Sequence, residues 1–297
     1  MATFFERLRA SASVRLRNYR AAARAWWHLS VDRRPFLYTD RNDITLNVHV
    51  EDDLRGMFFH RTHFDDPGLL AVVAPLLRRG ATVVDVGANY GQFTLFVAGR
   101  IGDTGRVHAF EPAPMAWDRL QENLACNIAL KGRISCHNLA LSDQPGRSDF
   151  YHYPMNPAWN SLYPHDKWLS LEHRARNAPT IAPQIVFTIN VNTLDCFCAE
   201  AEVTDIDLLK IDVEGFELAV LHGARKILEQ RRVRVVAFEV CPDLTVAIGH
   251  HPQIVIDFLT NVGYKCYKVE IDGRLNAVGA DFDFPFLSNF LAVPTNA

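Results

Sequence analysis

The segment VVDVGANYGQFT, residues 83–94, constrains the fold of this chain more than any other stretch. An apolar run ends at Asp85, Gly87 lets the backbone turn sharply, and Gly91 opens a segment that suits a helix. Asn89 tolerates the left-handed conformation that such turns need. The segment therefore predicts a buried strand, a tight glycine turn and the first turn of a helix, which is the building unit of α/β folds.

Short apolar runs separated by helical segments continue this pattern along the chain. A strand is predicted over 44–50 and a helix over 68–77, and further strands are predicted at RVHAFEP, ISCHNLALS, DIDLLKID, RVVAFEV, YKCYKVEI and NFLAVP. Their near-continuous apolar character favours a sheet that is covered on both faces. The sequence therefore predicts a doubly wound, Rossmann-like α/β sheet, and only the stretch 151–187 is irregular.

The N-terminal segment has a different composition. Apolar residues such as Phe4 and Trp26 recur there at helical spacing, and arginines occupy the other faces. We predict an N-terminal helical extension over residues 1–45 and a single α/β domain over residues 46–297. We interpret the extension as a helix that docks on its own domain or on a second copy of the chain, in a homo-oligomer. An arm on an anionic membrane surface and a transit peptide are the alternatives.

Charge and cysteine content exclude several classes of protein. Arginines interrupt every apolar run of the extension, so we expect no signal peptide and no spanning segment. We expect a cytoplasmic protein whose membrane contact, if the arm makes one, is peripheral at the inner membrane surface. A formal net charge of -3 does not favour nucleic acid as a partner. The cysteines are scattered without CxxC spacing, which predicts reduced thiols and neither a zinc ribbon nor a disulfide framework.

The glycine turn does not match the dinucleotide fingerprint. That fingerprint needs a glycine at its first, third and sixth positions, where this chain has Gly87, Asn89 and Gln92, so an NAD-dependent oxidoreductase is disfavoured. The turn still predicts backbone N–H groups and a positive helix end, which suit a carboxylate as well as a phosphate. Glu111 ends the second predicted strand, where an acid can accept hydrogen bonds from a ribose diol. A nucleoside-type cofactor is favoured.

The chain from about residue 80 to its end resembles the FkbM-type methyltransferase family, a branch of the class I S-adenosylmethionine-dependent enzymes. The motifs that carry the resemblance are VVDVGANYGQFT, HAFEPAP, NLALSD, VNTLDCF, LLKIDVEGFELAVLHGA and NFLAVP, in this order. The segment HRTHFDDPG departs from the family pattern before the first core strand, which bears on substrate contacts. The resemblance implies a class I methyltransferase fold, S-adenosyl-L-methionine as cofactor, and acceptor hydroxyls on sugars, glycolipids or secondary metabolites.

The resemblance also implies where the cofactor binds. The turn amides would face its methionine portion with Asp85 near its amino group, Glu111 would meet the ribose, and the adenine would lie close to Ala140. The full set of expected cofactor-binding residues is Asp85, Gly87, Ala88, Asn89, Tyr90, Gly91, Glu111, Ala140, Leu141 and Asp143. Two alternatives stay open, because Asp143 suits a turn cap and Tyr90 suits packing as well as a contact with the sulfonium.

Three acids at predicted strand ends are the candidates for a general base. Asp212 and Glu214 follow the strand DLLKID, and Glu239 ends RVVAFEV, so all three are expected at one cleft. A base must take the proton of an acceptor hydroxyl during methyl transfer. The alternatives are that Glu214 caps the next helix, that Glu239 orders a loop, or that the acids hold a divalent metal. We expect no metal, because carboxylates two residues apart do not identify a ligand set.

The aromatic stretch 151–168 is the expected acceptor element. Its rings and polar side chains suit a sugar or another small-molecule acceptor, although covering the core is the alternative role for the rings. His165 in this stretch is a further candidate base. We therefore predict an S-adenosylmethionine-dependent methyltransferase that acts on oxygen. The rival hypothesis is a noncatalytic cofactor-binding or assembly protein of a biosynthetic complex.

Overall fold

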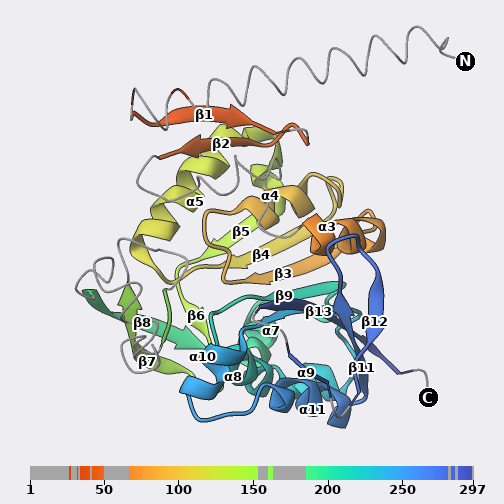
Figure 1. The fold of residues 1–297 in the computed structure, drawn as a ribbon. Helices are drawn as coiled ribbons and strands as arrows, with labels where there is room; N and C mark the ends of the chain where they lie inside the picture. The colour runs from red at the N-terminus through yellow and green to blue at the C-terminus, as the bar shows by residue number, and fades with distance from the viewer. Residues whose placement is uncertain are drawn as a thin grey trace, which may run out of the picture.

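The computed structural model describes most of the chain from residue 67 onward and one short region before it. The described residues are 27, 32, 34–40, 42–49, 67–152, 160–162, 185–279, 282–284 and 287–295. Within them the strands form an eight-stranded mixed sheet, a three-stranded sheet and a two-stranded hairpin (Figure 1). No helix among these residues is both long enough and apolar enough to span a membrane.

The eight-stranded sheet is the centre of the molecule and confirms the predicted Rossmann-like α/β fold. Its strands, in spatial order, are β12 (Leu275–Ala277), β11 (Tyr264–Val269), β13 (Ser288–Pro294), β10 (Val236–Val240), β9 (Leu208–Ile211), β3 (Thr82–Val86), β4 (Arg106–Phe110) and β5 (Ile134–His137). The five strands from β10 to β5 pair in parallel, and β13 runs antiparallel to both β10 and β11. The strand order reverses between β3 and β9, and ligands of open α/β sheets bind at such a switch point.

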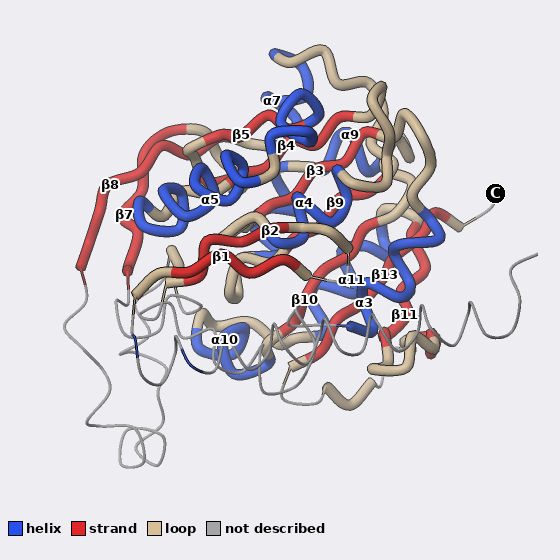
Figure 2. The backbone as a smooth tube through the Cα atoms, turned by 90° about the horizontal axis from the view of Figure 1, so that it is seen from above, coloured by secondary structure: helices blue, strands red, loops and turns tan. Residues whose placement is uncertain are grey.

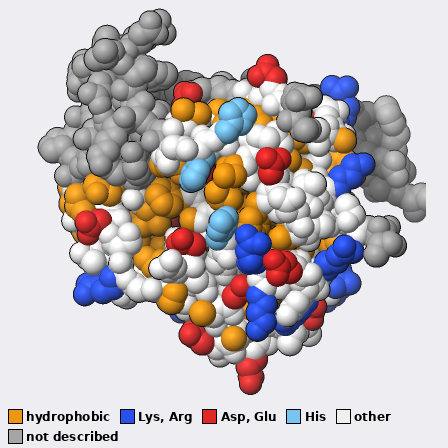
Figure 3. All heavy atoms as spheres, turned by 90° about the horizontal axis from the view of Figure 1, so that it is seen from below, with side chains coloured by type: hydrophobic (Ala, Val, Ile, Leu, Met, Phe, Trp, Pro, Cys, Tyr) orange, Lys and Arg blue, Asp and Glu red, His pale blue; other side chains and the backbone are white. Residues whose placement is uncertain are grey.

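Helices cover both faces of this sheet (Figure 1). One face carries α3 (Pro67–Val73), η3 (Ala74–Leu76), α4 (Gln92–Ala98), α5 (Pro114–Cys126) and η4 (Ile128–Arg133). The other carries α7 (Leu194–Glu200), α8 (Glu217–Gly223), α9 (Arg225–Glu229) and α11 (Gln253–Asn261), while α10 (Pro242–Ala247) follows β10. Figure 3 views the molecule from the side of the second set, where acidic and basic side chains are interspersed.

Alternate residues of each central strand pack into opposite halves of the core. Val83 and Leu208 join the core under α4 and α5, and Val84 and Leu209 join the core over α8 and α11. All four are buried, which explains why these strands are apolar at nearly every position. Because of this alternation, the position of a polar residue within a central strand determines which face of the sheet its side chain lies on.

A smaller sheet frames the predicted irregular stretch. It consists of β6 (Ala140–Leu141), β8 (Ile185–Asn192) and β7 (Gly146–His152), in that order. The prediction included neither β7, whose first positions are mostly exposed and polar, nor β8. It also joined β5 and β6 in the single run ISCHNLALS, whereas the two strands belong to different sheets. Most of the stretch between β7 and β8 lies outside the described residues.

A hairpin of β1 (Phe36–Thr39) and β2 (Thr45–Val48) lies against α5 (Figures 1 and 2). The strand predicted over 44–50 is confirmed as β2. The predicted boundary after residue 45 falls inside this hairpin, because β1 belongs to the segment that was assigned to the extension. The basic helix predicted before it lies, apart from residue 27, outside the described residues, so its role stays a prediction.

Candidate active site

Two charged residues face each other across the switch point of the sheet. Asp85 on β3 and Lys210 on β9 are register partners, and both lie on the face that carries α4. Lys210 Nζ is 3.6 Å from Asp85 Oδ1, and Thr94 of α4 donates a hydrogen bond to Asp85 Oδ2. Burial raises the pKa of Asp85, while Lys210 and Thr94 oppose that rise. Asp85 therefore belongs to an internal ion pair.

Lys210 extends this pair to the first predicted base. Its Nζ donates to Asp212 Oδ2 at 2.9 Å, and it lies 5.5 Å from the ring centroid of Phe93. Burial alone would lower the pKa of Lys210, but the charges of Asp212 and Asp85 outweigh it and leave the pKa raised. Sequence reasoning assigned no role to Lys210. The available signal was a lysine inside the apolar strand LLKI, since a buried cation needs anions close to it.

The three predicted catalytic acids come together. One carboxylate oxygen from each of Asp212, Glu214 and Glu239 lies within 4.8 Å of the other two, and all three residues are half-buried. The pKa of Glu239 is raised well above its usual value, first by burial and then by Asp212 and Glu214. We call these three residues the acidic cluster. Its geometry suits a base, because crowding of like charges favours proton uptake by one carboxylate.

Glu217, the first residue of α8, supports the bend that precedes this helix, which has no side-chain cap among the described residues. Its Oε1 accepts hydrogen bonds from the backbone N–H groups of Val213 (3.3 Å) and Gly215 (3.1 Å), in the bend before α8. Glu217 is buried, and burial raises its pKa to about 7. Glu214 occupies a left-handed conformation in this bend, with φ of 53°. The bend thus has its own buried acid, and the Glu214 carboxylate joins the acidic cluster.

The amides of the glycine turn are used within the protein. The N–H groups of Gly87 and Ala88 donate to the carbonyl of Phe110, that of Asn89 donates to Glu111 Oε2, and that of Gly91 donates to the carbonyl of Ala88. These four N–H groups therefore already have acceptors within the protein, and the placement of the methionine portion of a cofactor at the turn stays a prediction. The turn is folded onto the end of β4.

Both glycines of the turn have packing reasons to lack a side chain. A Cβ on Gly87 would clash with the backbone carbonyl oxygen of Asp212, and one on Gly91 would clash less severely with the side chain of Leu120. Both residues also have positive φ, of 79° and 81°. The glycines therefore let the turn approach the end of β9 and α5.

Glu111 is the polar centre of the turn. Its Oε2 accepts from Asn89 N at 2.8 Å, its Oε1 accepts from Ala113 N at 2.8 Å, and the side chain is 5% exposed. Burial raises its pKa to about 7, against the stabilising effect of these two amides. A carboxylate oxygen accepts more than one hydrogen bond, so Glu111 retains acceptor capacity for a ligand.

The residues expected near the adenine lie on β6 and just after it. Ala140 is buried in a small apolar cluster with Tyr90, Ala113 and Ala116, which brings β6 and the turn together. Leu141 packs instead into the core on the other face of the sheet. Asp143 is exposed and accepts a hydrogen bond at 3.2 Å from Oγ of its neighbour Ser142, a contact between side chains alone.

One described part of the irregular stretch reaches the acidic cluster. Ser161 is buried, exchanges backbone hydrogen bonds with Tyr151 at the end of β7, and donates from Oγ to the Glu214 carbonyl at 3.2 Å. The expected acceptor element is thereby attached beside a candidate base. His165 lies outside the described residues.

Fold and site together define a class of protein. A Rossmann-like sheet with a glycine turn and a buried acid at the end of the next strand binds nucleoside-type cofactors at its switch point. The model described as the methyltransferase FkbM domain matches residues 85–266. This span exceeds half of the chain, so the protein belongs to the FkbM methyltransferase family.

Proteins that are similar in sequence to this chain are named as methyltransferases. The 31-O-demethyl-FK506 methyltransferase FkbM of Streptomyces tacrolimicus is 34% identical over 188 residues, which cover 58% of this chain and 70% of that protein. The 2-O-methyltransferase NoeI of Sinorhizobium fredii is 28% identical over 167 residues, which cover 54% of this chain and 64% of that protein.

Two further matches cover smaller shares of the proteins to which this chain is similar. The methyltransferase sdnD of Sordaria araneosa is 34% identical over 155 residues, which cover 48% of this chain and 59% of that protein. The crystal structure of methyltransferase FkbM from Methylobacillus flagellatus aligns with a TM-score of 0.45 and 19% identity, over 80% of this chain and 49% of that chain. The chain thus spans less than two thirds of either protein.

Proposed function

We propose that this protein transfers a methyl group from S-adenosyl-L-methionine to a hydroxyl of a sugar, glycolipid or secondary metabolite. The observation that carries the proposal is the pairing of Glu111 at the glycine turn with the acidic cluster at the neighbouring strand ends. The first suits a ribose, and the second suits an alcohol that must lose a proton. Two relatives named as O-methyltransferases support oxygen as the acceptor atom.

The residues around the turn fit this cofactor. Asn89 Oδ1 is buried and has no hydrogen-bond partner among the described residues. A buried acceptor of this kind needs a donor, and S-adenosylmethionine offers an α-amino group and two ribose hydroxyls. Glu111 would hold the ribose, and the apolar wall of Tyr90 and Ala140 would border the cofactor. When bound, the cofactor would supply an electrophilic methyl group.

The acidic cluster would receive the proton of the acceptor. The pKa of Glu239 is raised well above its usual value, so this residue takes up a proton more readily than an ordinary carboxylate. Lys210 holds Asp212 in place by an ion pair and limits the negative charge of the cluster. Ser161 would keep the acceptor element close to Glu214. Alignment of the two reactants supplies the remainder of the acceleration.

The acceptor can be found by comparing extracts. Glycans, lipids and small metabolites from cells with and without the protein should differ by one methyl group on one class of compound, detected by mass spectrometry. The purified protein should then transfer a labelled methyl group from S-adenosylmethionine to the unmethylated compound. If the protein binds the cofactor but no extract differs and no label moves, the noncatalytic assembly role replaces this proposal.

A further inference from the structure

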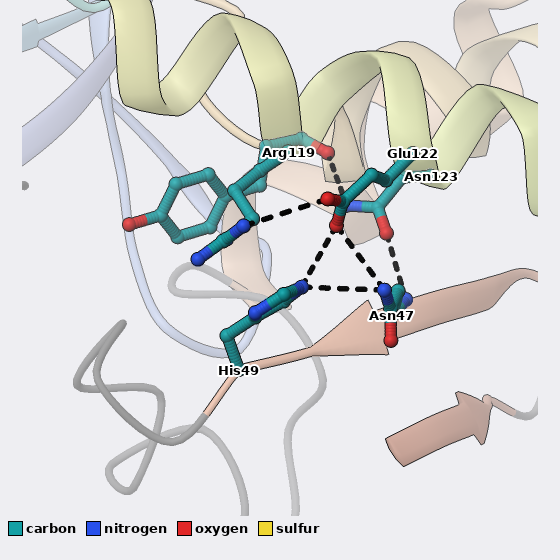
Figure 4. Close-up of polar contacts among 6 residues, drawn as sticks. Asn47, His49, Arg119, Glu122 and Asn123 are labelled. Atoms are coloured by element: carbon teal, nitrogen blue, oxygen red, sulfur yellow. Dashed lines mark hydrogen bonds and ion pairs between the residues drawn. The ribbon is translucent and has the colours of Figure 1, made fainter. Parts of the chain in front are cut away.

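Helix α5 lies between the N-terminal hairpin and the glycine turn, and one of its side chains bonds to both (Figure 4). Asn123 Nδ2 donates to the Tyr90 carbonyl at 2.7 Å, and Asn123 Oδ1 accepts from Asn47 N of β2 at 2.8 Å. The side chain is 2% exposed. Because the carbonyl needs a donor and the N–H needs an acceptor, the two partners fix the orientation of this amide.

Side chains on α5 and directly after it complete the attachment of the hairpin. Asn127 donates to the Thr45 carbonyl at 2.6 Å and accepts from Thr45 N at 3.0 Å, as a paired strand would. Glu122 Oε2 accepts from Asn47 Nδ2 at 3.1 Å and lies 2.8 Å from His49 Nε2 (Figure 4). Helix α5 thereby satisfies the edge of β2 that faces it.

The bond from Asn123 meets the turn where its backbone is most unusual. Tyr90 lies between Asn89 and Gly91, whose φ values are 48° and 81°. Glu111 holds this segment from the sheet side through Asn89 N, and Asn123 holds it from the helix side through the Tyr90 carbonyl. Without Asn123, the buried Tyr90 carbonyl would lose the hydrogen bond from this side chain, and the turn would lose its side-chain bond to α5.

We propose that Asn123 is a positioning residue, through which docking of the N-terminal hairpin and binding of the cofactor at the glycine turn stabilise each other. The inference rests on the proposed function, because it assumes that S-adenosylmethionine and its product S-adenosylhomocysteine bind at this turn. Coupling of this kind is reciprocal. Bound ligand must stabilise the docked hairpin by the same free energy by which the docked hairpin strengthens ligand binding.

Two neutral, similarly sized substitutions separate coupling from simple stability. Asn123→Leu removes the side-chain bonds to Asn47 and Tyr90. Asn127→Leu removes the bonds to Thr45 and to the backbone carbonyl of Asn123, and it leaves the Tyr90 bond in place. Calorimetry with S-adenosylhomocysteine should show a dissociation constant raised about tenfold in Asn123→Leu, the effect of one buried group left unsatisfied. Asn127→Leu should stay within about twofold of the wild type while losing a similar amount of thermal stability.

Hydrogen exchange tests the reciprocal half of the proposal. S-adenosylhomocysteine should slow exchange of the Asn47 amide in the wild-type protein, and this protection should be absent in Asn123→Leu. Once an acceptor is known, the KM for the cofactor should rise in Asn123→Leu with kcat nearly unchanged, because only binding is affected.

The outcomes distinguish the two proposals. Two outcomes overturn the coupling alone, provided that the wild type binds S-adenosylhomocysteine. Either the dissociation constant in Asn123→Leu equals that of the wild type, or Asn123→Leu and Asn127→Leu lose the same amount of affinity. Failure of the folded wild type to bind the ligand overturns the proposed function and the coupling together. Should Asn123→Leu not fold, the wild-type exchange data decide, and an Asn47 amide that gains no protection from the ligand overturns the coupling.

Discussion

The glycine turn and the acidic cluster lie at the ends of neighbouring strands of one sheet, but the surroundings of their acidic side chains differ. Glu111 and Glu239 both have raised pKa values, and burial is the largest cause for each. Two backbone amides bind the oxygens of Glu111, whereas Asp212 and Glu214 add like charge around Glu239. The proposed function assigns the first acid to ligand binding, and the second acid lies in an environment that favours accepting a proton.

If the proposed function is correct, one sheet separates the binding residue from the catalytic residues. A hydrogen-bonded carboxylate has a fixed geometry, which suits recognition of a diol. A carboxylate crowded by others gains from neutralisation, which suits a base. Lys210 connects the two regions, because it contacts Asp85 beside the turn and Asp212 in the cluster.

The largest expected effect is on turnover when the acidic cluster is neutralised. Asp212→Asn, Glu214→Gln and Glu239→Gln should be measured for kcat, KM and cofactor affinity, and loss of the general base should lower kcat about 10²–10⁴-fold. Cofactor affinity should change little, because Glu111 is intact in all three. Near-normal turnover in every variant would move the base elsewhere, with His165 next to be tested.

The same assay distinguishes a base from a metal site. The cluster has the spacing of a cation site, since its oxygens lie within 4.8 Å of one another. We expect a chelator to leave turnover unchanged. Activity that is lost with chelator and restored by a divalent ion would reassign the acids as metal ligands, without changing the methyl-transfer proposal.

The next largest effect concerns the contact between the two regions. Gly87→Ala should destabilise the fold by about 3 kcal/mol or more, because the new Cβ meets the Asp212 carbonyl and the residue keeps a positive φ. Gly132→Ala is the matched control, since no atom lies within 4 Å of its added Cβ. Urea unfolding should separate the two, and equal stabilities would mean that the turn does not approach β9 as described.

Binding at the turn should depend on pH through Glu111. Its raised pKa, about 7, keeps it partly protonated in neutral solution, and a ribose diol binds the ionised form better. Affinity for S-adenosylhomocysteine should therefore rise as the pH increases from 6 to 8. In Glu111→Gln the affinity should be lower by about 1–3 kcal/mol and this pH dependence should be much weaker. A variant with the wild-type pH profile would assign the titration to another group, such as Glu217.

A smaller pH effect is expected at the acidic cluster, where the stability of the fold should fall as the pH rises. The folded-state pKa of Glu239 is raised, so the folded protein binds a proton there that the unfolded chain has released once the pH exceeds about 4.5. Stability therefore falls as the pH rises from about 4.5 through the folded pKa. Glu239→Gln removes that loss, and it should be more stable than wild type by about 1 kcal/mol at pH 8 but not at pH 4. A variant that is destabilised at pH 8 would show that the Glu239 charge supports the fold.

The smallest effect on cofactor binding is expected from the N-terminal extension. Deleting residues 1–30 leaves the hairpin, the glycine turn and Glu111 in the chain, so affinity should stay nearly unchanged. Sedimentation and liposome flotation should instead reveal a change of oligomeric state or of membrane retention. If cofactor binding is lost by a truncated protein that still folds, the extension belongs to the catalytic domain.

Much of the sheet could be predicted because its strands are apolar on both faces. The strands containing Val83 and Leu209 have this property, whereas β7 has exposed polar positions and was not found. The proximity of Asp212 and Glu239 could be predicted as well, since both lie at the carboxyl ends of parallel strands, which meet at the same edge of the sheet.

Side-chain contacts between distant segments could not be predicted in the same way. The amides of the turn looked free, because the carbonyl of Phe110 that accepts two of them is distant in sequence. The role of Lys210 depends on its register opposite Asp85, which no local pattern specifies. Asn123 and Asn127 were missed because an asparagine on a helix gives no sign of the strand that it will bind.

Titration of the wild-type protein with S-adenosylmethionine, S-adenosylhomocysteine and NAD is the most direct test of the central claim that the glycine turn and Glu111 form a methyl-donor site. Isothermal calorimetry should give micromolar dissociation constants for the first two ligands and no measurable heat of binding for NAD. The Glu111→Ala variant, with its fold verified by circular dichroism, should bind both ligands more weakly by about 1–3 kcal/mol. Preference for NAD, or unchanged affinity in that variant, would contradict the account.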